Sequence, residues 1–144
     1  MDKLLKQYNN QSIPYISVGE LRMLQMNSVV MILDPREPDE YSVSHLKSAK
    51  NVGYNHFSTN DKNLQYLDKG ATVIVYCSVG IRSEKIGEAL KKAGFTTVKN
   101  LYGGIFEWIN KGYPVIDSTG IETENVHAFS QHWSKYLQAG NLVY

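Results

Sequence analysis

One short loop holds the residues best suited to do chemistry, including the only cysteine of the chain. It consists of Cys77, Ser78, Val79, Gly80, Ile81, Arg82 and Ser83. A cysteine attacks as its thiolate, which is favoured by nearby positive charge and by inward-pointing backbone N–H groups. Gly80 lets the backbone approach a bound anion closely, and Arg82 adds a full positive charge. The loop therefore predicts an activated Cys77 in an anion-binding turn.

The segments on either side of this loop place Cys77 between a strand and a helix. Residues 71–76 form an apolar run typical of a buried β-strand, and residues 84–93 carry apolar side chains at helical spacing. The thiol would then lie at a helix N-terminus, whose partial positive charge also stabilises a thiolate. A lone cysteine at a strand end is otherwise most often a small core residue. Gly80 and Arg82 favour the reactive site over that alternative.

Further strands and helices alternate along the chain. The patterns predict strands at Tyr15–Ile16, Val29–Leu33, Ala49–Val52, around Val73 and at Thr96–Leu101, and helices at 17–26, 37–43, 60–68, 84–93 and 105–110. This alternation indicates an α/β fold with an open, mainly parallel five-stranded sheet and helices on both faces. Asp34 and Cys77 each follow the carboxyl end of a strand, so we expect both at the edge where such sheets bind ligands.

Length and composition limit the class of protein. The 144 residues suit one domain, and 15 Lys and Arg against 14 Asp and Glu leave no basic stripe for nucleic acid. No apolar run is long enough to span a membrane, and the N-terminus lacks a signal core. A single free cysteine suits the cytoplasm. The four histidines are scattered, so we expect no metal site.

Three segments in order resemble a single rhodanese (sulfurtransferase) domain, over about residues 14–116. The first comprises residues 33–41 with His45-Leu46 and Ala49-Lys50-Asn51-Val52. The second is the Cys77 loop, and the third comprises Gly103-Gly104-Ile105, Trp108 and Gly112-Tyr113-Pro114-Val115. The domain organisation expected from this is an N-terminal arm at 1–14, loose or with a short helix, the rhodanese-like domain at 15–116 and an extension at 117–144.

The resemblance implies a sulfurtransferase in which Cys77 carries a sulfane sulfur as a persulfide, without a metal or organic cofactor. Residues 78–83 would hold the persulfide or the donor, and Arg82 would brace the loop by pairing with an acid. Asp34 is a candidate for that acid, with a simple turn or cap as the alternative. Arg36 would be either a rim charge or part of a structural ion pair. His45, Gly103-Gly104 and Trp108 are expected to be structural.

The expected partners are a small sulfur donor and a thiol or cyanide acceptor, with delivery of sulfur to or from another protein as a further option. The chain would be a monomer or homodimer. The loop position of Val79 and the acidic Glu40 weaken attraction for a dianion such as thiosulfate, so a thiol persulfide fits equally well. Residues 44–49 also lack the glycines and proline that usually end the first signature.

Two other functions remain alternatives at this stage. Some rhodanese-like domains are non-catalytic binding modules, although these usually lack the cysteine. A phosphatase or arsenate reductase is less favoured, because four residues separate Cys77 from Arg82 and the related loops are one residue longer. A shorter loop is too narrow to wrap a transferring phosphoryl group.

The extension at 117–144 carries apolar residues at helical spacing. They are Val126, Phe129, Trp133, Tyr136 and Leu137. This pattern predicts a helix that packs on the domain's own surface, and the alternative is a dimer contact or a docking face for a partner.

Overall fold

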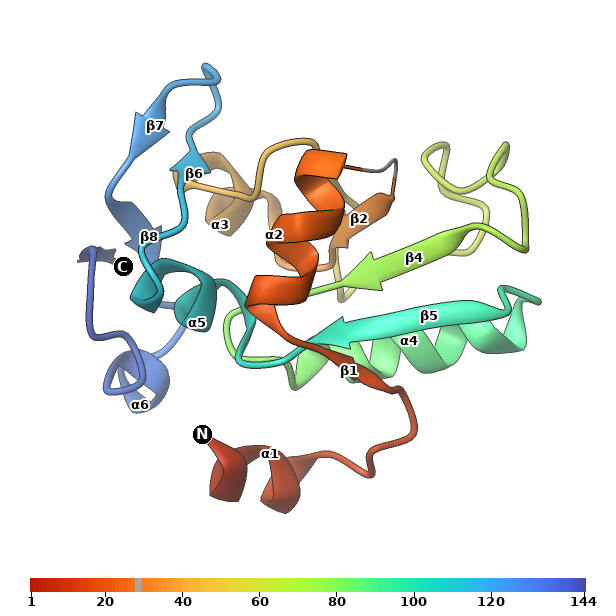
Figure 1. Cartoon of the computed structure of the whole chain (residues 1–144), viewed down its shortest axis with the longest axis horizontal. Coiled ribbons are helices and arrows are strands. Elements are labelled where there is room, and N and C mark those ends of the chain that lie inside the picture. The colour runs from red at the N-terminus through yellow and green to blue at the C-terminus, as the bar shows by residue number, and fades with distance from the viewer. Residues whose placement is uncertain (28–29) are drawn as a thin grey trace.

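The computed structural model describes residues 1–27 and 30–144 and contains a five-stranded parallel sheet in the order β1-β5-β4-β2-β3 (Figure 1). The strands are β1 (Tyr15–Ile16), β2 (Met31–Asp34), β3 (Lys50–Asn51), β4 (Thr72–Val75) and β5 (Thr97–Leu101). Every neighbouring pair in this sheet is parallel. The predicted fold class is therefore confirmed. Ser28 and Val29 lie outside the described residues, and Val29 is the first residue of one predicted strand.

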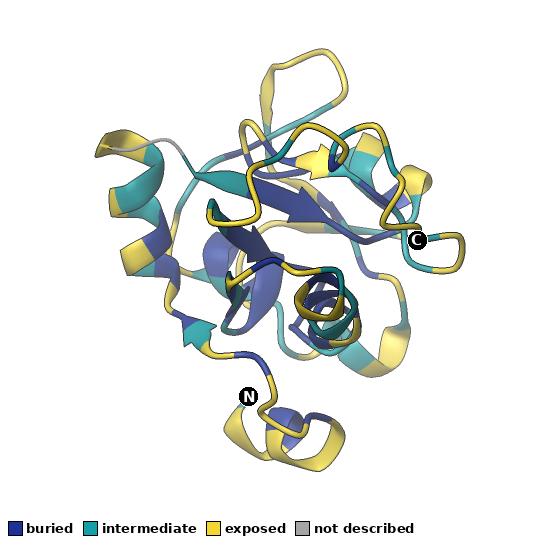
Figure 2. Ribbon diagram, turned by 90° about the vertical axis from the view of Figure 1, so that its right-hand side faces the viewer, coloured by how far each residue is buried: buried dark blue, intermediate teal, exposed yellow. Residues whose placement is uncertain are grey.

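Helices cover both faces of the sheet, because successive strand residues point to opposite sides. On one face Ile74 packs in a cluster with α2 (Val18–Asn27) and α5 (Gly104–Asn110). On the other face Val73 and Val75 pack against α4 (Arg82–Lys92). In Figure 1, α2 crosses in front of the sheet and α4 lies behind it. Figure 2 shows the buried residues gathered in the strands and the inner sides of these helices.

Local sequence signals account for where the remaining elements begin. The helix α2 follows a reciprocal capping box, in which Ser17 Oγ accepts from the Glu20 N–H at 3.1 Å and Glu20 Oε1 accepts from the Ser17 N–H at 3.4 Å. The short helix α3 (Pro38–Val43) has proline in its first turn, as predicted. The N-terminal arm contains α1 (Asp2–Tyr8), with Leu4 and Leu5 buried.

The predicted helix at 60–68 is wrong, because this segment forms turns. Asp61 organises them: its side chain accepts from the Asn63 N–H at 2.8 Å and its carbonyl accepts from the Leu64 N–H at 2.8 Å. An aspartate that bonds its own backbone two residues on favours a turn over a continuing helix. Leu64 is nevertheless buried, so its apolar character correctly indicated burial.

The predicted helix of the extension is also wrong. The segment after β6 (Val115–Ile116) contains β7 (Glu122–Thr123), β8 (Asn125–His127), the four-residue helix α6 (Gln131–Ser134) and β9 (Asn141–Val143). The strands β8 and β9 pair in parallel, and β6 and β7 pair antiparallel. Phe129 has a φ of +64°, which no residue of a right-handed helix adopts. Val126 packs in the core from β8, and Trp133, Tyr136 and Leu137 contact it from α6 and the turns that follow, whereas Phe129 is exposed.

The part of the chain with described coordinates has no helix that combines the length and the apolar character needed to cross a membrane.

The helix α5 is anchored to the loop that follows β4. The Ile105 N–H donates to the Cys77 carbonyl at 2.9 Å, and the Phe106 N–H donates to the Ser78 carbonyl at 3.1 Å. Gly104 makes this approach possible, because it has a φ of +61° and a Cβ at its position would lie 2.6 Å from the carbonyl carbon of Ser78. Gly103-Gly104 thus has a structural role, as expected, and its second glycine is required by contact with the cysteine loop.

Replacing Gly104 with alanine should therefore destabilise the fold. We expect Gly104→Ala to lower the free energy of unfolding by about 2 kcal/mol or more, from left-handed backbone strain together with the clash. Gly112→Ala is the matched control, because Gly112 has a φ of +82° but nothing lies within 4 Å of its added Cβ. Urea denaturation of both variants measures the difference. Equal losses would show that contact with the loop adds no cost.

Candidate functional site

The structure places Cys77 in the loop between β4, which ends at Val75, and α4, which begins at Arg82. The side chain is only 1% exposed. Its Sγ accepts from the Gly80 N–H at 3.2 Å and lies 3.5 Å from the Ser83 hydroxyl. Ser78, Val79, Gly80 and Ser83 are buried with it, whereas Ile81 and Arg82 are half-buried. Of the six other residues predicted for the loop, Gly80 and Ser83 contact the sulfur atom directly.

Two opposing effects act on the pKa of the Cys77 thiol. Burial raises it, because a charged sulfur loses its hydration. The Arg82 charge and hydrogen bonds from Ser83 and the Gly80 N–H favour the thiolate, and together they lower the pKa below its ordinary value. The loop therefore supplies by its own groups the stabilisation that water would otherwise give.

Asn100 on β5 holds the loop from the neighbouring strand. Its Nδ2 donates to the Gly80 carbonyl at 2.9 Å, and its Oδ1 accepts from the Ser83 hydroxyl at 2.6 Å. The single hydroxyl proton of Ser83 thus has two acceptors in reach, Asn100 Oδ1 and Cys77 Sγ. Asn100 was not predicted from the sequence. A buried polar residue within a strand pattern was the only available signal.

The N-terminal arm closes on the same loop from outside. Asn9 Nδ2 donates to the Gly80 carbonyl at 2.9 Å, so this oxygen accepts from two amides. The backbone N–H groups of Asn10 and Gln11 donate to the buried Glu84 carboxylate in the first turn of α4, at 2.9 and 3.1 Å. These contacts fix the start of α4 relative to Cys77. The sequence predicted either a loose arm or a short helix here; α1 agrees with the second, but these contacts were not predicted.

Arg82 pairs with Glu40 of α3. Its two terminal nitrogens donate to the two Glu40 oxygens, each at 2.8 Å, and Nη2 also donates to Ser78 Oγ at 3.1 Å. Glu40 Oε2 accepts in addition from the Glu37 N–H at 2.9 Å. Burial raises the pKa of Glu40, but the bonds and charge of Arg82 outweigh it and hold the pKa below its ordinary value. Glu40 was predicted only as an acidic residue that weakens attraction for anions.

The prediction that Asp34 could pair with Arg82 is wrong. Asp34 pairs with Arg36, through Arg36 Nη2 at 2.8 Å and Nε at 3.0 Å, and both side chains are fully buried. Arg36 is two residues away, and its backbone N–H also donates to Asp34 at 2.9 Å. The Asp34 carboxylate is therefore already paired locally with Arg36. The proposed rim position of Arg36 is therefore wrong and its structural ion pair is correct.

Tyr76 connects this buried pair to the cysteine. Its hydroxyl donates to Asp34 Oδ2 at 2.5 Å. Burial and the Asp34 charge raise the pKa of Tyr76 well above its ordinary value, so the hydroxyl keeps the proton it donates. Arg36 Nη2 also donates to the Ser44 carbonyl at 2.7 Å. The cluster fixes the residue before Cys77 and the segment that carries α3.

His45 has a structural role, as predicted. Its Nδ1 lies 2.9 Å from the Tyr41 carbonyl and its ring stacks on that of Tyr41 at 3.7 Å. Its backbone exchanges two hydrogen bonds with Ile116. Trp108 is fully buried, also as predicted, and its indole N–H donates to the Pro114 carbonyl at 2.9 Å.

A small cavity of about 90 Å³ opens at Cys77. Its walls come from loop residues and from two aromatic residues of the extension; they are Ser78, Val79, Ile81, Arg82, Phe129 and Trp133. The Phe129 ring lies over the Arg82 guanidinium, 3.8 Å from its central carbon. Sequence reasoning recognised both aromatics but placed them on a helix, and nothing in their spacing indicated contact with Cys77.

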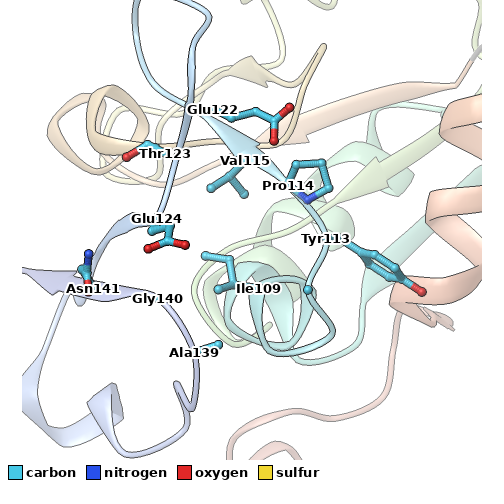
Figure 3. Close-up of a pocket in the computed structure, with 11 residues that line it drawn as sticks. Ile109, Tyr113, Pro114, Val115, Glu122, Thr123, Glu124, Ala139, Gly140 and Asn141 are labelled. Carbon is cyan, nitrogen blue, oxygen red and sulfur yellow. The ribbon is translucent and has the colours of Figure 1, made fainter.

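A larger cavity of about 500 Å³ lies elsewhere, between the end of α5, β6, β7 and the start of β9 (Figure 3). Ile109 and Val115 form its apolar part, and Glu122 and Glu124 contribute carboxylates at its margin. None of the residues that line it belongs to the cysteine loop. Within residues 1–27 and 30–144, no group of three or more His, Cys, Asp or Glu side chains is arranged to hold a metal ion.

A family model and a solved structure both relate this chain to rhodanese-like proteins. The family model described as Rhodanese-like domain matches residues 17–111. Among solved structures, a rhodanese-related protein from Thermoplasma volcanium superposes with a TM-score of 0.61 and 27% identity, covering 72% of this chain and 97% of that one.

Two curated relatives each match about two thirds of the chain. A tRNA uridine(34) hydroxylase from Aster yellows witches'-broom phytoplasma is 34% identical over 97 residues, covering 65% of this chain and 32% of the relative. The probable adenylyltransferase/sulfurtransferase MoeZ from Mycobacterium tuberculosis is 31% identical over 100 residues, covering 69% and 25%. The chain thus spans between a quarter and a third of the length of these relatives.

The pKa of Cys77 should depend on Arg82. We expect Arg82→Gln to raise that pKa, because an opposite charge close to the sulfur is lost. Thiolate absorbance near 240 nm, measured against pH with Cys77→Ser as the blank, reads the pKa directly. Arg22→Gln is the matched control, since Arg22 bonds Gln25 on α2. An unchanged pKa in Arg82→Gln would contradict a stabilising role for this charge.

The Arg82–Glu40 pair should also make the stability of the fold depend on pH. The folded pKa of Glu40 is depressed below 4.5, so the pair contributes in full above pH 4.5 and its contribution is lost as the pH falls through the folded pKa. We expect Glu40→Gln to lower the free energy of unfolding by about 3 kcal/mol at pH 7. The variant should then lose less than the wild type on further acidification. Urea denaturation across this range, with the exposed Glu122→Gln as control, measures both effects.

Proposed function

Because this chain belongs to the rhodanese-like domain family, we propose that it is a sulfurtransferase that carries a sulfane sulfur on Cys77. One observation carries the proposal: a buried sulfur accepts a backbone N–H at the N-terminal end of α4 and has a lowered pKa. A structural core cysteine needs none of these contacts. A thiol with a lowered pKa in such a turn is suited to nucleophilic attack on a sulfur donor.

The reaction is a double displacement. The Cys77 thiolate attacks the outer sulfur of the donor, a new S–S bond forms, and the donor's remaining part leaves with the electron pair of the broken bond. With thiosulfate the leaving group is sulfite, and with a thiol persulfide it is the thiolate. An acceptor such as cyanide or a thiol then attacks the outer sulfur of the persulfide and returns Cys77 as a thiolate. No metal or organic cofactor enters either step.

The residues of the loop have distinct roles in this proposal. Cys77 is the nucleophile. The backbone of Ser78, Val79, Gly80, Ile81 and Ser83, with the Ser83 hydroxyl, binds the anionic sulfur. Arg82 stabilises the thiolate and positions the loop through Glu40 and Ser78. Asp34 and Arg36 act as positioning residues behind Tyr76.

The relatives support sulfur transfer as the shared chemistry. The name of the Mycobacterium tuberculosis protein includes sulfurtransferase, and the match covers 25% of that protein. The hydroxylase name belongs to a protein of which this chain spans 32%. We therefore propose sulfur transfer at Cys77 and assign no tRNA hydroxylation to this chain.

The first test is a gain of one sulfur atom on the protein. Intact mass should increase by one sulfur after incubation of the reduced protein with thiosulfate or with glutathione persulfide, and cyanide should remove it as thiocyanate. Cys77→Ser should gain nothing under the same conditions. If no donor transfers sulfur to the wild type, the catalytic proposal fails. A sulfur-independent binding module or a phosphatase-like hydrolase would then be tested in its place.

A further inference from the structure

We propose that Phe129 and Trp133 make the Cys77 site selective for organic sulfur donors that carry a single negative charge and an apolar group, over the dianion thiosulfate. This inference rests on the proposed sulfur transfer and names its substrate class. Both aromatics lie outside residues 17–111, the segment that the family model matches. The selectivity would therefore be supplied by this chain's own extension.

The first argument is the composition of the walls around the sulfur. The cavity at Cys77 is lined by Val79 and Ile81 from the loop and by Phe129 and Trp133 from the extension. Its polar side chains are Ser78 and Arg82, and both are already hydrogen-bonded, Arg82 donating to Ser78. A donor that enters brings its reactive sulfur to the loop and its remaining part against aromatic rings, which favour an apolar group.

The second argument is charge. Arg82 is the cation of the loop, but both its terminal nitrogens donate to Glu40, so the pair is formally neutral. The Phe129 ring also covers the guanidinium, 3.8 Å away. A Cys77 thiolate then leaves the site with a net negative charge. A dianion is repelled more strongly by such a site than a donor with one charge.

The third argument is that Phe129 of the aromatic wall, which Phe129 and Trp133 form, is held in place at an energetic cost. Phe129 has a φ of +64°, which is unusual for a large L-residue and concentrates at functional sites. Its N–H donates to His127 Nδ1 at 2.9 Å, and the next residue back, Ala128, is fully buried and donates to the Val143 carbonyl at 2.8 Å. The Phe129 side chain is nevertheless 47% exposed, so part of its ring is free to contact a substrate.

Trp133 is fixed by separate contacts. Its ring meets that of Tyr8 on α1 edge to face, with centroids 5.6 Å apart. The helix α6 that carries it is capped by Ser130, whose hydroxyl accepts from the His132 N–H at 3.1 Å. The two chain ends thus meet beside the cavity. The wall is consequently a packed feature of the fold on which a donor's apolar group can rest.

Three donors separate the effect of charge from that of the apolar group. Thiosulfate is a dianion, methanethiosulfonate is a monoanion with a methyl group, and benzenethiosulfonate is a monoanion with a ring. With either thiosulfonate the Cys77 thiolate takes the outer sulfur, the bond from that sulfur to the sulfonyl sulfur breaks, and a sulfinate leaves with the electron pair. Thiocyanate formation with cyanide as acceptor gives kcat/KM for each donor.

We expect the wild type to prefer benzenethiosulfonate over methanethiosulfonate by about tenfold in kcat/KM, the ratio that burial of part of a ring supports. Phe129→Gly and Trp133→Ala should each reduce this ratio to within about threefold of unity. Phe129→Gly also relieves the left-handed backbone. Ile121→Ala removes an exposed apolar side chain of the same extension away from the cavity and should leave the ratio unchanged. Raising the salt concentration should increase kcat/KM more for thiosulfate than for methanethiosulfonate.

Thermal unfolding identifies any variant that fails to fold. Phe129→Leu or Trp133→Leu then replaces the failed variant at that position, and its ratio of kcat/KM for the two thiosulfonates should lie between that of the wild type and unity. Equal use of the two thiosulfonates by the wild type, or a ratio unchanged in the cavity variants, would overturn the selectivity. Sulfur transfer from thiosulfate or methanethiosulfonate in that case would leave the proposed function intact. If none of the three donors transfers sulfur, both proposals fail.

Discussion

The burial of Cys77 is the constraint on which the rest of the site depends. A sulfur that is 1% exposed has no water to stabilise its anion, so protein groups must do so. The Gly80 N–H and Ser83 act directly, and Arg82 adds charge. Arg82 is itself mostly buried and requires a partner, which Glu40 provides from α3. The segment that carries α3 is in turn held by the Asp34–Arg36 pair through Ser44. The polar contacts that support the buried thiol thus extend from the Cys77 loop to α3 and to the end of β2.

The sequence predicted the parts of this arrangement that depend on short-range order. The strand before Cys77, the helix after it and the turn at Gly103-Gly104 are local patterns, and the parallel sheet follows from their alternation. The partner of Arg82 could not be predicted in the same way. Asp34 and Glu40 both lie in the first signature. Which of them pairs with Arg82 depends on Arg36, because the backbone N–H and the side chain of Arg36 already donate to the Asp34 carboxylate.

The extension shows a second limit of sequence patterns. Apolar residues spaced three or four apart predict an amphipathic helix, but the same spacing arises when short strands and turns each bury one or two side chains. Val126 is buried from a strand, whereas Trp133 packs from a single helical turn. The pattern correctly indicated contact with the core for Val126, Trp133, Tyr136 and Leu137, but it predicted neither the exposure of Phe129 nor the conformation of the segment. The contact of Phe129 with Arg82 joins residues 47 positions apart and requires a backbone angle that no pattern indicates.

The position of the aromatic wall outside residues 17–111 has an evolutionary consequence. Substitution of Phe129 or Trp133 alters the mouth of the cavity but leaves the groups that bond the sulfur in place. Under the proposed function, substitutions in the extension can change which sulfur donor the site accepts while the residues that contact the Cys77 thiol stay the same. Under the proposed function, selection on the choice of sulfur donor and selection on the reactivity of the thiol act on separate segments of the sequence.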